Sequence, residues 1–158
     1  MRRYFFIFCF LILVSAFLPA QTAGSGIQTA GAIEQLLESE AVSYEQAAMF
    51  VLQAADLGNF LSNASPTGAF QYAVERNWLP KRVSGSDEAE LQGISLLVME
   101  SFGFKGGMFY SIAKNPHYAY RELVYQEVLQ GRIDPKMAVS GEYLLFVIGR
   151  ALSRVEEL

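Results

Sequence analysis

The stretch that decides the fold spans residues 139–147 and reads Val139-Ser140-Gly141-Glu142-Tyr143-Leu144-Leu145-Phe146-Val147. One apolar residue comes first, mostly polar positions follow, and an apolar run closes the stretch. Ser140 is a typical helix N-cap, because its hydroxyl accepts a hydrogen bond from a free N–H of the first turn. Glu142 lies at the positive end of the helix dipole, where a carboxylate is favourable. The stretch therefore predicts a capped helix over 140–154.

Two other stretches have the same order of apolar and polar residues. The first starts at Val42 and shares the Ser-x-Glu pattern at Ser43 and Glu45, and the second starts at Leu91. The three starts lie 49 and 48 residues apart. The stretches therefore predict three equivalent helices whose first apolar residues point to a common core.

A second set of helix openings has nearly the same spacing. Ser65-Pro66 and Asn115-Pro116 each place an N-cap residue before a proline, and they lie 50 residues apart. Periods of roughly 20–50 residues are typical of repeat architectures. The sequence predicts an all-α fold with about six helices in three helix–loop–helix pairs, related by a pseudo-threefold repeat. The alternative is a chance alignment, because 52% of the residues are hydrophobic.

The other helices are predicted from apolar residues at helical spacing and from Gly and Pro breaks. They are expected at 32–38, 42–55, 65–78, 90–102 and 115–131. The segment 103–114 contains Gly106-Gly107 and is compatible with a loop or a broken helix.

The N-terminus has the parts of a secretory signal. Met1-Arg2-Arg3 is a short basic region, residues 4–18 are apolar, and small and polar residues follow. A membrane-spanning helix needs about 20 apolar residues, so this run is too short. We expect a signal peptide over 1–20, cleaved between residues 20 and 24, then a flexible N-terminus over 21–30 and a single helical domain over 31–158. The alternative is an uncleaved anchor.

Charge and cysteine content argue against several classes of function. The formal net charge is −4, and loss of Arg2 and Arg3 with the leader lowers it to −6. A negative chain argues against nucleic acid, whose phosphates require a basic patch, and against electrostatic docking on anionic lipid. Cys9 is the only cysteine and lies in the leader, so the mature chain has no disulfide and no thiolate metal site. We expect no transmembrane segment after cleavage.

One stretch carries a family resemblance: Gln130-Gly131-Arg132-Ile133-Asp134-Pro135-Lys136-Met137-Ala138-Val139-Ser140-Gly141-Glu142-Tyr143-Leu144-Leu145. It resembles the S-layer homology domain, a triplicated helix–loop–helix module, over roughly residues 32–152. The resemblance implies three helix pairs and contact with anionic cell-wall polysaccharide. The arginine that the family carries beside the capping residue is replaced here by Tyr44, Gly93 and Gly141.

Other segments are similar to uncharacterised helical proteins secreted by spirochaetes. They are Asn77-Trp78-Leu79-Pro80, Lys105-Gly106-Gly107 and Tyr118-Ala119-Tyr120-Arg121-Glu122-Leu123. This resemblance implies no known activity.

The sequence predicts no catalytic, metal or cofactor site. His117 is the only histidine, so a zinc site there would depend on carboxylates alone. Asp87, Glu88 and Glu90 crowd one helix start, where the helix dipole favours negative charge, rather than flanking a cleft as glycosidase carboxyls do. Lys105-Gly106-Gly107 lacks the order of a phosphate-binding loop.

A binding face is predicted where aromatic residues are dense, over 102–125. Aromatic rings stack on sugars, and an arginine forks onto carboxylates. The alternative is that these rings are core packing. The residues expected to bind are Trp78, Lys105, Tyr110, His117, Tyr118 and Arg121.

These features predict a non-enzymatic binding or scaffolding module, exported to the periplasm or cell envelope. Its expected partner is cell-wall glycan or another envelope protein. One alternative is a cell-wall polymer hydrolase that uses Glu residues. Another is a structural subunit of an envelope complex.

Overall fold

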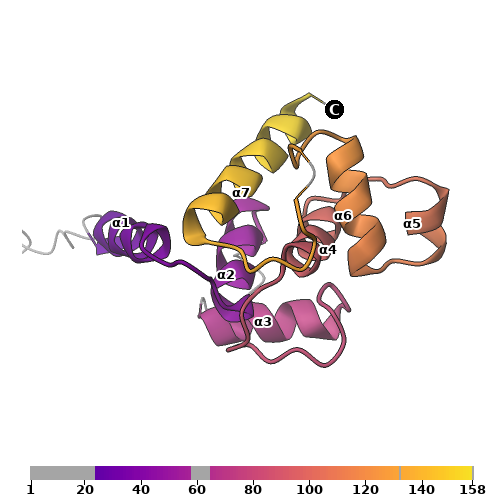
Figure 1. The fold of residues 1–158 in the computed structure, drawn as a ribbon. Coiled ribbons are helices and arrows are strands. Elements are labelled where there is room, and N and C mark those ends of the chain that lie inside the picture. The colour runs from indigo at the N-terminus through magenta and orange to yellow at the C-terminus, as the bar shows by residue number, and fades with distance from the viewer. Residues whose placement is uncertain (1–23, 58–64, 132, 158) are drawn as a thin grey trace, which may run out of the picture. The chain divides into compact units, whose positions relative to one another are not determined.

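The computed structural model describes residues 24–57, 65–131 and 133–157, and within them every regular element is a helix. This confirms the all-α prediction. The described part has seven helices rather than six, because a short helix interrupts the segment 103–114 (Figure 1). The helices are α1 (Gly24–Leu37), α2 (Tyr44–Ala54), α3 (Pro66–Glu75), α4 (Leu91–Ser101), α5 (Met108–Ile112), α6 (Pro116–Tyr125) and α7 (Gly141–Glu156).

The described residues divide into two units, with the boundary between residues 33 and 34 inside α1. The predicted signal peptide, 1–20, lies outside the described residues. Residues 24–30 belong to α1. The apolar spacing seen at 32–38 thus belongs to a helix that begins eight residues earlier than its predicted start. Among the helices of the described residues, none has the length and apolar character that crossing a bilayer requires.

The second unit has one hydrophobic core, and α4 lies at its centre. Every residue from Gly93 to Met99 is buried, as expected for a helix that is surrounded on all sides. Helix α4 packs against α6, and α2 packs against α3, α4 and α7. Gly93 allows α4 to approach α2 closely, because a side chain there would overlap the ring of Tyr44 in α2.

The predicted helix caps are confirmed. The Ser43 hydroxyl accepts from the backbone N–H of Gln46, whose side-chain amide oxygen accepts from the Ser43 N–H in return. Ser140 accepts from the N–H of Tyr143 at 3.2 Å. Two further caps, Ser65 and Asn115, precede the prolines that begin α3 and α6.

Three buried residues before helices form a closed ring of backbone hydrogen bonds. The N–H of Val42 donates to the carbonyl of Val139 at 2.8 Å, and the N–H of Val139 donates to that of Ala89 at 3.0 Å. The N–H of Ala89 donates to the carbonyl of Val42 at 2.8 Å. Leu91, which the sequence aligns with Val42 and Val139, lies two residues beyond Ala89, and its N–H donates to Met137 instead. Ala89 is small and lies between Glu88 and Glu90, so the sequence does not mark it as an apolar position.

The first residue of each of these helices is bonded to another segment. The N–H of Leu91 donates to Met137, and that of Tyr44 donates to Asp87. The N–H of Gly141 donates to Ser39. First-turn N–H groups have no partner within their own helix, so these bonds satisfy them and tie each helix start to the loop before another helix.

Helix α6 ends at Tyr125, six residues before its predicted end at Gly131. Glu127 adopts a positive φ of 60°, and the N–H groups of Val128 and Leu129 both return to the carbonyl of Leu123. The turn buries both apolar residues. Since Val128 and Leu129 point into the core, the apolar pattern continues beyond the helix and misplaces its end.

Candidate functional site

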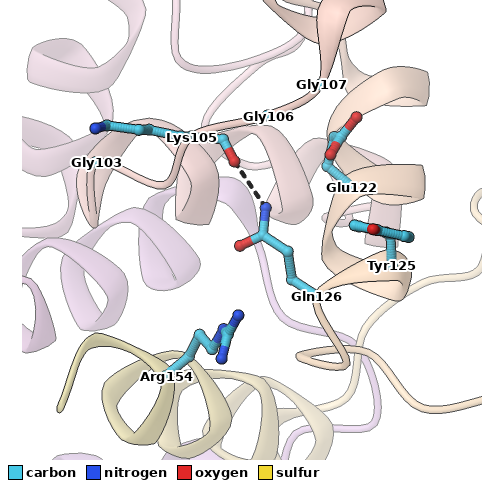
Figure 2. A pocket seen from close by; sticks show the side chains of 8 residues that line it. All are labelled: Gly103, Lys105, Gly106, Gly107, Glu122, Tyr125, Gln126 and Arg154. Carbon is cyan, nitrogen blue, oxygen red and sulfur yellow. Dashed lines mark hydrogen bonds between the residues drawn. The ribbon is translucent and has the colours of Figure 1, made fainter. Parts of the chain in front are cut away.

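An open groove of about 770 Å³ lies where the loop after α4 meets the ends of α6 and α7 (Figure 2). Three of its lining residues are glycines, so the loop backbone forms much of one wall. The lining residues are Gly103, Lys105, Gly106, Gly107, Glu122, Tyr125, Gln126 and Arg154.

Two contacts hold the loop against α6. The side-chain amide of Gln126 donates to the carbonyl oxygen of Lys105 at 2.9 Å. The carboxylate of Glu122 lies so near Gly107 that a Cβ added there would stand 3.0 Å from Oε1. Tyr125, one residue before Gln126, is 84% exposed at the edge of the groove. The groove therefore has a fixed polar wall and a freely accessible aromatic ring.

Helix α7 supplies cations to the groove and to a smaller neighbouring cavity of about 210 Å³. Figure 2 shows Arg154 extending from α7 toward Gln126. Its Nη1 pairs with Glu157 at 2.9 Å, and its buried Nε has no hydrogen-bond partner among the described residues. Arg150 lines the smaller cavity and donates to the carbonyl of Glu127 at 2.6 Å, and its buried Nε likewise meets no partner in the part of the chain that the structure describes. A guanidinium carries five N–H donors, so the terminal nitrogens of both arginines keep donors beyond the bonds described, whereas the buried Nε atoms are inaccessible to a ligand.

The arrangement suits binding of a polar ligand. An exposed tyrosine offers an apolar face for a sugar ring, and guanidinium groups donate to carboxylates. Glu122 and the Gln126 amide add an acceptor and further polar contacts. Across the described ranges, no group of three His, Cys, Asp or Glu side chains is placed to hold a metal ion.

Lys105 is the member of the predicted binding set that lines the groove. Figure 2 shows its side chain extending away from Glu122. Tyr110 is buried in α5, and its hydroxyl donates to Glu100 at 2.5 Å. Burial and the neighbouring Glu100 carboxylate raise the pKa of the Tyr110 hydroxyl well above its usual range. Tyr110 thus serves as an anchor for α5.

The predicted residues of α6 lie near α5. Tyr118 is half-buried and stacks on Phe109 with ring centroids 5.9 Å apart, and His117 meets Tyr118 edge-on at 5.7 Å. Arg121 is exposed and forms no ion pair with any described residue. Three of the predicted residues therefore come together on α6, next to the groove residues of the same helix.

Trp78 belongs to another cluster, at the end of α3. It meets Tyr72 edge-on at 5.8 Å, and the guanidinium of Arg76 lies 3.5 Å from the Tyr72 ring centroid. Trp78 is therefore partly covered by Tyr72 of the preceding helix, α3.

The sequence interpretation missed Glu122, Tyr125, Gln126 and Arg154 as groove residues. The spacing of Glu122, Tyr125 and Gln126 on one helix offers a signal, since residues three and four apart share a face. Arg154 gives no such signal, because only the fold brings the end of α7 to the end of α6.

The chain matches no protein-family model, no curated protein and no solved structure.

Proposed function

We propose that this protein is an exported, non-enzymatic binding module of the cell envelope, and that the groove between loop 103–107, α6 and α7 contacts cell-wall glycan or a carboxylate-bearing envelope partner. The observation that carries the proposal is the combination of an 84% exposed Tyr125 with Arg154 in one groove. Ring stacking and guanidinium donation together recognise sugars that carry carboxylates.

The carboxylates of the site support binding over hydrolysis. Glu122 is the carboxylate among the residues that line the groove, whereas glycoside hydrolysis requires two carboxyl groups across the scissile bond. Glu127 and Glu157 line the smaller cavity, and Glu157 is paired with Arg154. The binding experiment also tests whether the protein is a hydrolase.

We also propose that the fold is a pseudo-threefold repeat, as the likeness to the S-layer homology domain implies. The closed ring of Val42, Ala89 and Val139 supports this, because each residue donates to one and accepts from another. The turns after α3 and α6 also agree at a 50-residue spacing. Asn77 and Glu127 both have positive φ, and the following N–H groups return to residues 73 and 123. An experimental structure tests the repeat by superposition of residues 65–91 on 115–141.

The experiment is a pull-down of the exported protein against peptidoglycan sacculi and against an envelope extract. Lys105→Ala combined with Arg154→Gln should weaken binding about tenfold or more, and so should Tyr125→Ala. Lys81→Ala, at an exposed lysine in the loop after α3, is the matched control and should bind like the wild type. Thermal midpoints of all variants establish that each is folded.

Two results contradict the proposal. The first is wild-type protein that binds neither sacculi nor an envelope component. The second is release of soluble sugar from sacculi that Glu122→Gln abolishes, since this would make the protein a hydrolase. If the Lys105/Arg154 variant binds as well as the wild type, the groove takes no part in the interaction.

A further inference from the structure

Helix α5 presents an apolar surface that is largely exposed. Met108 is 68% exposed, Phe109 is 62% exposed and Ile112 is 79% exposed. Figure 1 shows α5 at the outer edge of its unit, beyond α6. Large side chains of this kind gathered at one place usually mark an interaction site. We call Met108, Phe109 and Ile112 the apolar tip.

The tip is held in a defined position. Tyr110, on the opposite side of the same short helix, is 3% exposed and bonded to Glu100. Phe104 is also buried, and Phe109 stacks on Tyr118 of α6. The tip is thus exposed even though α5, the helix that carries it, is anchored in the fold.

Charge around the tip is opposite in sign to that of the whole chain. Residues 100–122 hold Lys105, Lys114 and Arg121 against Glu100 and Glu122, a net charge of +1 with His117 neutral, whereas the full chain has a net charge of −4. Two carboxylates lie near: Glu100 pairs with Lys114 at 2.9 Å, and Glu122 stands beside Gly107. The segment that carries the tip is therefore locally cationic.

We propose that the apolar tip inserts into the headgroup region of an anionic lipid membrane, with Lys114 and Arg121 contacting lipid phosphates. Interfacial membrane binding combines apolar side chains that enter the acyl boundary with cations that attract anionic lipid. A projecting tip with a cationic surround fits a membrane surface better than a flat protein interface, where charged residues are depleted at the centre. The proposal does not rest on the groove. It assigns the protein a second contact, which would hold the groove close to the membrane surface.

The first experiment locates the tip at the bilayer. Ile112→Cys, in a Cys9→Ser background, carries a polarity-sensitive dye, and Val74→Cys carries it as the matched control on α3, where the side chain is 46% exposed. We expect a blue shift at position 112, and none at position 74, on addition of vesicles of phosphatidylglycerol and phosphatidylcholine. This readout is local, so partitioning of the leader does not produce it. Absence of the shift at position 112 overturns the proposal, and it is also the result expected if the tip serves a protein partner.

The second experiment measures affinity for the same vesicles by co-sedimentation of the exported protein. Met108→Ser combined with Ile112→Ser should weaken binding about tenfold or more, because both side chains lose apolar burial. Arg121→Ala should weaken it about fivefold, an effect that added salt removes. Val74→Ser is the control, and thermal midpoints report folding. Equal binding by the Met108/Ile112 variant and the wild type overturns the proposal, whereas loss of sacculus binding in an Arg154→Gln variant with vesicle binding intact concerns the groove alone.

Discussion

The backbone N–H of Val42 donates to the carbonyl oxygen of Val139 at 2.8 Å, which joins the segment before α2 to the segment before α7. Ala89 completes the ring from the segment before α4. All three residues are fully buried and lie outside helices. The ring therefore couples three distant parts of the chain at one point of the core.

Amide hydrogen exchange should show this coupling. The N–H groups of Val42, Ala89 and Val139 should exchange only through global unfolding, because opening any one bond breaks the ring inside the core. The N–H of Ser111, in the exposed helix α5, should exchange much faster. Exchange of the ring amides at the rate of Ser111 would contradict the prediction.

A single methyl group added at Gly141 should have a large effect on stability. A Cβ there would overlap the backbone carbonyl of Leu36, which cannot move as a flexible side chain can. Gly141→Ala should lower the free energy of unfolding by about 3 kcal/mol. Gly149→Ala in the same helix meets nothing within 4 Å and should raise it by roughly 0.5–1 kcal/mol. Denaturant titration of both variants checks the contrast, and equal effects would refute it.

Gly141 also illustrates why the sequence predicts helices better than their assembly. Ser140 and Glu142 predict a helix start from local chemistry, and the structure has it within one residue. The need for glycine between them comes from Leu36, which is distant in the sequence. In the same way, hydrogen bonds between segments, rather than local apolarity, place Ala89 instead of Leu91 in the ring.

Removal of the Ser140 cap should cost about 1 kcal/mol of stability. Its hydroxyl satisfies the N–H of Tyr143, which loses its side-chain acceptor in Ser140→Ala. Ser153→Ala, near the other end of α7, should be neutral or slightly stabilising, since that hydroxyl only returns to the carbonyl of Gly149. Denaturant midpoints distinguish the two, and a neutral Ser140→Ala would contradict the role of the cap.

The predicted site shows the same division between local and long-range information. Aromatic density over 102–125 led to Lys105, Tyr110, His117, Tyr118 and Arg121, all of which lie on α5, α6 or the loop before them. Density alone does not separate anchors from accessible rings. Tyr110 is buried against Glu100, whereas Tyr125 of the same region is almost fully exposed.

Arg121→Ala should leave the fold unchanged. Arg121 is exposed and has no ion-pair partner among the described residues, so the free energy of unfolding should change by less than about 0.5 kcal/mol. Arg76→Ala is the contrast, because Arg76 covers the Tyr72 ring and should cost about 0.5–1 kcal/mol. A loss of a few kcal/mol in Arg121→Ala would instead identify a buried ion pair.

Stability should fall in alkaline solution through the buried tyrosines. Burial raises the pKa of Tyr110 and of Tyr44 in the folded protein, while unfolded tyrosines ionise near about pH 10. Because the folded state holds these protons more tightly, their contribution is fully present below about pH 10 and is lost as the pH rises further.

Tyr110→Phe separates the two contributions of this hydroxyl. At neutral pH the variant should lose about 1–2 kcal/mol, since the hydrogen bond to the Glu100 carboxylate is gone while Glu100 keeps Lys114. Between neutral pH and about pH 11 it should lose less further stability than the wild type, because one tyrosine that resists ionisation is gone. Denaturant unfolding at both pH values checks this, with Tyr125→Phe, at an exposed ring, as the control that should follow the wild type. The same alkaline loss in Tyr110→Phe as in the wild type would show that Tyr110 does not set the alkaline limit of stability.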